Sequence, residues 1–237
     1  MSLRPLKSYF FLLTLLFFFG CLAWHAIAGN AIQCHCFANR TYNPAKKFEA
    51  DDYILATCFN SLLARLADLP KKQIVMIKMN EGVSQDDLLI GLKIAKITGQ
   101  TLQNVLDLRR RNNSWAEIIT ALQPHESIDE GETLRNIRSG GDVGVIGAMV
   151  ADEMIAEFFK ISSEKIDKLR MSGLSEKEIT LILILNHVSE IQPEALVLQY
   201  KNQQRSWSEI AHNLGLEPKA AGRLILAYPS KTIPAND

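Results

Sequence analysis

The sequence predicts an all-α protein in which two similar helical units follow an N-terminal leader. Apolar residues recur at helical spacing through most of the chain, and no long alternating run indicates strands. Motifs of the second half repeat those of the first about 91 or 92 residues later, which indicates an internal duplication. The chain opens with a short cationic stretch and then a long apolar segment, which is typical of a leader.

Residues 1–28 are predicted to be a signal peptide, because two cations precede the apolar run and small residues precede Gly29. Two alternatives remain. The run is long enough to stay as a membrane anchor, with membrane contact through residues 9–28, or Cys21 could be lipidated. All three place the chain from Gly29 onward outside the cytoplasm, in the periplasm or the extracellular space.

The charge balance argues against two classes of partner. The chain has 26 Lys and Arg residues against 26 Asp and Glu residues. Removal of the leader takes away Arg4 and Lys7 and leaves 24 basic against 26 acidic residues. A nearly neutral protein has no broad field toward nucleic acid or anionic lipid.

The chain is predicted to divide into six parts. These are the leader (1–28), a cysteine-containing arm (29–50), helical unit 1 (51–124), a linker (125–144), helical unit 2 (145–228) and a tail (229–237). Each unit is expected to hold four helices, and the linker one short helix near residues 132–137. The offset of 91 changes to 92 along the repeat, and we expect a one-residue insertion near residues 180–190.

A serine followed three residues later by an acid occurs twice in each unit, which predicts four capped helix starts. The pairs are Ser84 with Asp87, Ser114 with Glu117, Ser175 with Glu178, and Ser206 with Glu209. Glycines at 82, 173 and 215 stand where helices are expected to end, because glycine tolerates the left-handed conformation found there.

Trp115 and Trp207 follow two of these serines, and we expect both to be core residues that cover the joint between neighbouring helices. The second motif also fits the first helix of a helix-turn-helix over residues 206–227. Lys219 and Arg223 would be the only cations of its recognition helix, which is too few for phosphate anchoring and base contacts.

Three cysteines remain after the leader, namely Cys34, Cys36 and Cys58. In an oxidising compartment they predict a structural disulfide, either a staple from the arm to Cys58 or a strained bond between Cys34 and Cys36. Free thiols, a metal site that includes His35, and a redox role are the alternatives. Cys58 lies in a predicted apolar helix, where it would be a small core residue.

No metalloprotease, nucleophile-elbow, phosphate-loop or dinucleotide motif occurs, so the sequence predicts no catalytic residue, metal site or cofactor. The favoured interpretation is an exported, non-enzymatic binding or structural module of the cell envelope. It would bind an unknown envelope protein or ligand in the groove between the two units. A thiol-dependent role through Cys34 and Cys36 is the first alternative, and DNA binding by residues 206–227 is the second.

The combination of the leader, the C-x-C-F arm, the run DDYILAT and the repeated S-W-x-E-I motif resembles exported bacterial helical-repeat proteins. That group has no known activity. Nothing is therefore carried over from that group to the residues of this chain.

Overall fold

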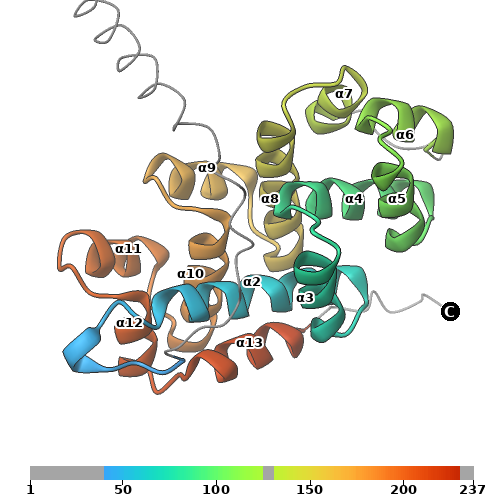
Figure 1. Cartoon of the computed structure of the whole chain (residues 1–237). Helices are drawn as coiled ribbons and strands as arrows, with labels where there is room; N and C mark the ends of the chain where they lie inside the picture. Colours follow the sequence, from blue (N-terminus) through green and yellow to red (C-terminus); the bar gives the residue numbers. More distant parts are fainter. Residues whose placement is uncertain (1–39, 125–130, 230–237) are drawn as a thin grey trace, which may run out of the picture. The chain divides into compact units, whose positions relative to one another are not determined.

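The regular structure of the described residues is all helical, which confirms the prediction of an all-α protein. The computed structural model describes residues 40–124 and 131–229, which lie within one unit spanning Cys36–Asp237. These residues form twelve α-helices, one short 3-10 helix and no strand. In chain order they are η2 (Pro44–Lys46), α2 (Asp51–Ala67), α3 (Lys71–Asn80), α4 (Gln85–Thr98), α5 (Leu102–Arg110), α6 (Trp115–Leu122), α7 (Glu132–Arg138), α8 (Val143–Phe159), α9 (Ser163–Met171), α10 (Glu176–Ser189), α11 (Pro193–Lys201), α12 (Trp207–Asn213) and α13 (Pro218–Leu226) (Figure 1).

The helix starts recur along the chain. Helices α8 to α12 begin 92, 92, 91, 91 and 92 residues after α2 to α6. We call α2–α7 the first half and α8–α13 the second half. The expected insertion near residues 180–190 is wrong, because α10 runs unbroken through most of that range. The extra residue lies in the loop between α11 and α12, where it does not rotate a helix face by about 100°. Val105 therefore corresponds to Leu196, and both side chains are 0% exposed.

The expectation of four helices in each unit is also wrong, since residues 51–124 contain five helices and residues 145–228 contain six. In the first half, α2 ends where Asp68 takes the left-handed conformation, at a φ of 51°, and Pro70 then precedes α3. In the second half, Lys160 ends α8 in the same conformation, at a φ of 54°. Residues other than glycine seldom adopt this conformation, so the sequence carried little signal for the break after Phe159, whereas Pro70 does mark the break after Ala67.

Two other boundary predictions are confirmed. The short helix expected near residues 132–137 is α7, at Glu132–Arg138. Gly82, Gly173 and Gly215 have φ values of 65°, 71° and 73°, so all three take the left-handed conformation. This conformation lets the chain turn sharply between two helices at each of these places.

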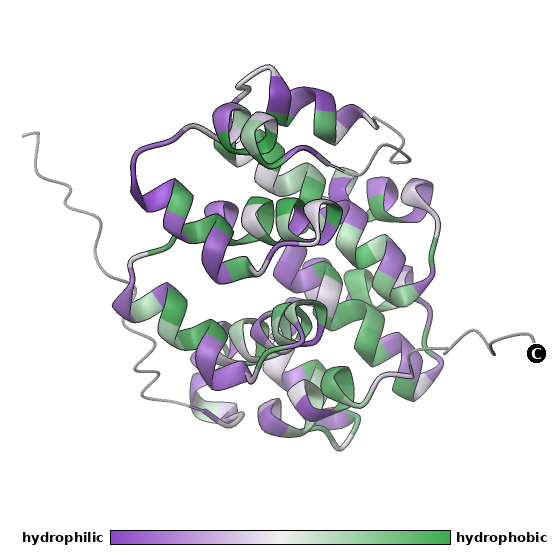
Figure 2. Cartoon of the chain, turned by 90° about the vertical axis from the view of Figure 1, so that its right-hand side faces the viewer, coloured by the Kyte–Doolittle hydropathy of each residue, from purple (hydrophilic) through white to green (hydrophobic). Residues whose placement is uncertain are grey.

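The first helix of each half is buried mainly by helices of the other half. Helix α2 packs against α10 and α13, and α8 packs against α4 and α7 (Figure 1). The fit between α2 and α13 is close at Gly222, where an added Cβ would lie 2.8 Å from Thr57 Cγ2 and 2.9 Å from Ser61 Oγ. Figure 2 shows hydrophilic and hydrophobic residues alternating along many helices, as expected where one face is buried.

A buried carboxylate also joins the halves at the start of α2. Asp51 accepts hydrogen bonds from the backbone nitrogens of Trp207 at 3.0 Å and Ser208 at 2.8 Å, which lie in the first turn of α12. The Ser208 hydroxyl is 2.7 Å from the same carboxylate. Burial raises the pKa of Asp51 even though these hydrogen bonds oppose the rise. Asp51 therefore caps a helix that lies more than 150 residues away in sequence.

The starts of α4 and α10 meet at a polar cluster with matching partners from both halves. Gln85 donates to Glu176 Oε1 at 2.6 Å, and these are the first residues of the two helices. Lys78 bonds Asn60 at 3.2 Å, and at the corresponding positions Arg170 bonds Asp152 at 2.9 Å. The pKa of Lys78 falls to about 8, first because of burial and second because of Lys177, while Glu176 opposes the fall.

Candidate functional site

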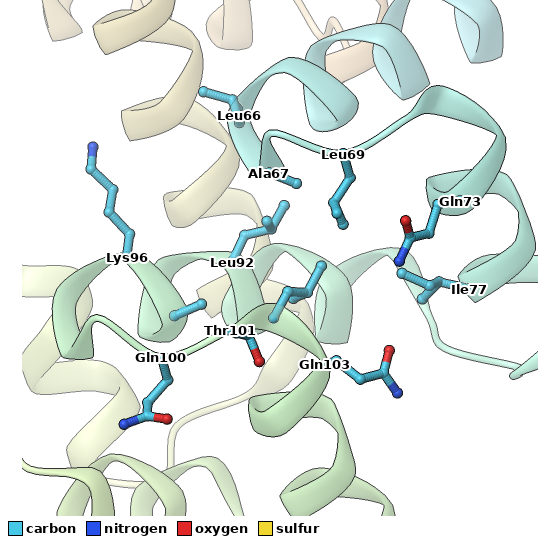
Figure 3. Close-up of a pocket in the computed structure, with 12 residues that line it drawn as sticks. Leu66, Ala67, Leu69, Gln73, Ile77, Leu92, Lys96, Gln100, Thr101 and Gln103 are labelled. Atoms are coloured by element: carbon cyan, nitrogen blue, oxygen red, sulfur yellow. The ribbon is translucent and has the colours of Figure 1, made fainter.

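The candidate site is an apolar groove of about 390 Å³ in the first half. It lies where α2 and α4 end and where α3 and α5 begin (Figure 3). Its lining residues are Leu66, Ala67, Leu69, Gln73, Ile77, Leu92, Ala95, Lys96, Gln100, Thr101, Leu102 and Gln103. This groove and two further pockets are each lined by residues of a single half, so none of these three is the expected groove between the two units.

Helix ends position the walls of this groove. Helix α4 ends at Gly99, whose φ of 68° turns the chain toward α5. Thr101 then caps α5 by accepting a hydrogen bond from the backbone nitrogen of Asn104 at 3.2 Å. On the opposite side, the left-handed turn at Asp68 directs Leu69 toward Leu92 across the groove (Figure 3). Four helix ends therefore hold the site, and no flexible lid is needed to form it.

The floor and the rim of the groove differ in chemistry. The floor is apolar and closely packed, with Ile77 only 2% exposed and Leu92 5% exposed. The rim carries the side-chain amides of Gln73, Gln100 and Gln103, which are exposed. An apolar floor with a few polar groups at its edge is the usual construction of a site that binds an apolar group and orients it.

Lys96 is the one charged residue of the lining. Its Nζ lies 2.5 Å from Glu157 Oε1 on α8, and the two side chains are 59% and 64% exposed. Such an exposed pair contributes at most about 1 kcal/mol, so the ammonium can turn to another anion at little cost. The groove holds no acid, histidine or cysteine that could act in catalysis.

The four serines predicted to start helices all cap them. Each hydroxyl accepts a hydrogen bond from the backbone nitrogen three residues later, over 3.0 Å for Ser84, 3.2 Å for Ser114, 3.3 Å for Ser175 and 3.0 Å for Ser206. Two of the four also make the reciprocal bond of a full capping box, in which the backbone nitrogen of Ser114 donates to Glu117 and that of Ser175 donates to Glu178. At Ser206 the cap consists of the hydrogen bond that the backbone nitrogen of Glu209 donates to the serine hydroxyl.

The two tryptophans lie in the core, 4% exposed for Trp115 and 1% for Trp207. Their indole nitrogens donate to Asp87 Oδ1 and to Glu178 Oε1, both at 3.0 Å. Each acceptor also bonds its own capping serine through its other oxygen, Asp87 to Ser84 and Glu178 to Ser175. One carboxylate in each half therefore joins the starts of two helices, a role that the spacing alone did not reveal.

Different side chains support the two indole rings. The guanidinium of Arg109 lies 5.0 Å from the Trp115 ring and its Nε donates to Asp87 at 3.0 Å. In the second half, the Tyr200 ring stacks on Trp207 with centroids 4.2 Å apart. None of the serines, tryptophans or acids that define the repeat lines the groove, so these residues build the frame.

Among the described residues there is no disulfide, and Cys58 is a free thiol that is 0% exposed. Its side chain lies in the core of α2, as its position in an apolar helix predicted. Burial raises the pKa of the Cys58 thiol to about 12, and the nearby Lys71 opposes the rise. Cys34 and Cys36 lie outside the described residues, and so does Cys21.

Sequence reasoning did not identify the groove residues. They are common aliphatic and amide side chains from four helices and two loops, and no motif connects them. One signal was available in the repeat itself, because Ala67 of α2 stands where α8 has Phe159. A small residue in place of a large one at a matching helix end indicates unfilled space.

Similarity to known proteins assigns no family or function to this chain. No protein-family model, curated protein or solved structure matches this chain. Among the described residues, no group of three or more His, Cys, Asp and Glu side chains is arranged to hold a metal ion. None of the helices placed between residues 40 and 229 combines the length and the apolar character that crossing a bilayer requires.

Replacement of Trp207 by alanine is expected to lower the free energy of unfolding by about 3–5 kcal/mol, since a large buried ring is lost. Replacement by phenylalanine should cost about 1–3 kcal/mol, because Glu178 then loses the indole donor. Urea unfolding followed by circular dichroism measures both. An alanine variant within about 1 kcal/mol of the parent would show that the ring does not support the fold.

Cys58 is expected to resist alkylation by iodoacetamide in the folded protein at mildly alkaline pH, because the thiol is buried and its pKa lies near 12. The same thiol should react readily in concentrated urea, which serves as the control. Mass spectrometry of the peptide that contains Cys58 measures the modified fraction. Equal alkylation rates in the two samples would contradict the buried position.

Proposed function

We propose that this protein is an exported, non-enzymatic binding module of the cell envelope, and that the groove is its binding site. The groove carries the proposal, since it combines an apolar floor with a polar rim and contains no set of catalytic groups. The leader supports export, because residues 1–28 have the pattern of a signal peptide. The partner would be a ligand or a protein of the envelope.

The proposal includes an origin by internal duplication. Its support is the recurrence of helix starts at 91 or 92 residues, together with matched contacts such as Lys78 with Asn60 and Arg170 with Asp152. A duplicated frame fits a binding role, because a position in one half can change locally while its counterpart keeps the original packing. The groove is such a local change, since it lies in the first half.

The two alternatives have less support. Helix α13, the recognition helix of the DNA-binding alternative, packs one face against α2 at Gly222 and leaves Lys219 and Arg223 as its exposed cations. Two cations are few for holding phosphates and reading bases. The thiol alternative depends on Cys34 and Cys36, which lie outside the described residues.

Export predicts that native cells contain the protein in the envelope fraction, with an intact mass that corresponds to residues 29–237. Retention of the anchor or lipidation at Cys21 would give a larger mass in the same fraction. The measurement is intact mass spectrometry on fractionated cells, with and without reduction and alkylation. A full-length protein in the cytosol would contradict export and would make a DNA-binding assay the next experiment.

The binding site predicts that small apolar carboxylates bind in the groove. Phenylpropanoate or heptanoate should shift the methyl NMR signals of Leu69, Ile77 and Leu92, which line it. The methyl signals of Leu185, which is 0% exposed in α10, should stay in place and serve as the internal control. If neither compound shifts the groove signals at millimolar concentration, the groove is not a binding site.

A further inference from the structure

The second half has aromatic residues at two positions that line the groove in the first half. Helices α2 and α8 have the same length, and both end in a left-handed residue, so the last residue of α2, Ala67, corresponds to Phe159. The residue before it, Leu66, corresponds to Phe158 by the same offset. The two halves therefore share a frame at this place, and the first half lacks the aromatic rings that the second half has.

These rings are packed in the second half. Phe159 is 6% exposed, and its ring lies 4.9 Å from Phe158 and 5.1 Å from Tyr228, in edge-on arrangements. Tyr228 also lies 4.8 Å from His187. His187 stands in α10 where Lys96 stands in α4, at the rim of the groove. One ring is thus buried at the helix end, and the Tyr228 ring packs beside both it and the counterpart of Lys96.

The charged residue at the rim indicates which polar group a ligand would carry. Lys96 is the single charged residue among those that line the groove, and it is a cation. Its partner Glu157 is an exposed residue on a neighbouring helix. A ligand with an anionic group could replace Glu157 as the partner of the ammonium, because an ion pair this exposed contributes little.

We propose that the groove binds a small aromatic carboxylate, with the ring in the space that Ala67 leaves open and the carboxylate at Lys96. This inference rests on the proposed function of the groove as a binding site. The ring would occupy the position of Phe159 and contact the apolar floor at Ile77 and Leu92. A rigid ring loses less conformational freedom on binding than a flexible chain of the same length, so it binds more tightly.

The test uses a protein of residues 29–237 and compares its affinity for three compounds of similar length. Methyl NMR titration measures each affinity. Phenylpropanoate is expected to bind about three- to tenfold more tightly than heptanoate, which has no ring. It should bind about two- to fivefold more tightly than phenylpropanol, which has no charge. Replacement of Lys96 by methionine should abolish the second difference, while the same change at the exposed Lys219 of α13 should preserve it.

A variant that supplies the missing ring gives an independent test. Ala67→Phe should weaken phenylpropanoate binding by about tenfold or more, because the new side chain fills the groove. Ala148→Phe, at an exposed position of α8, is the matched control and should bind as the parent does. If Ala67→Phe fails to fold, Leu69→Trp places a ring at the mouth of the groove from a loop and should have the same effect.

The outcomes separate this inference from the proposed function. Heptanoate binding as tight as that of phenylpropanoate, and blocked by Ala67→Phe, would overturn the aromatic ligand and leave the groove as a binding site. Binding that Lys96→Met does not change would overturn the carboxylate contact. Tighter binding of a tripeptide ending in phenylalanine would identify a protein terminus and overturn the small ligand. The absence of binding by any compound would overturn both proposals.

Discussion

The fold depends on one constraint, which is that the first helix of each half packs mainly against helices of the other half. Helices α2 and α8 contain long runs of buried apolar residues, including Ile54 and Leu62 in α2 and Val150 and Ile155 in α8. Helices of the other half supply most of the cover for each of them. Separation of the halves would expose both helices to water, at a cost of about 25 cal/mol for each Å² of apolar surface. Neither half therefore has a complete core of its own.

Polar contacts then fix the arrangement that burial alone would leave loose. Apolar packing is non-directional, whereas hydrogen bonds at helix ends hold particular atoms. The carboxylates of Asp87 and Glu178 each join two helix starts within a half, and Asp51 joins α2 to α12 across the halves. The frame is thus specified at helix starts. Residues at helix ends remain free to change, and Ala67 and Phe159 differ at just such a place.

The sequence predicted features with a local cause and missed those that arise from long-range packing. The caps at Ser114 and Ser175 and the short helix α7 follow from residues close together in the chain. The break after Phe159 was missed, because Lys160 takes a conformation that is usual for glycine. The groove depends on which helices meet, and neither helix composition nor spacing determines that.

The open groove lowers the stability of the fold, because the first half has alanine at a position where the second half buries a phenylalanine. A phenylalanine at the end of α8 is almost fully buried, and burial of such a side chain stabilises a protein by about 1.5–3 kcal/mol. The first half forgoes this gain by holding alanine at the matching position. Proteins commonly retain such losses where a ligand must enter, and the proposed binding role would account for this one. The same reasoning explains why the frame on both sides of the groove is so closely specified, because an unfilled site keeps its shape only if its walls are held from elsewhere.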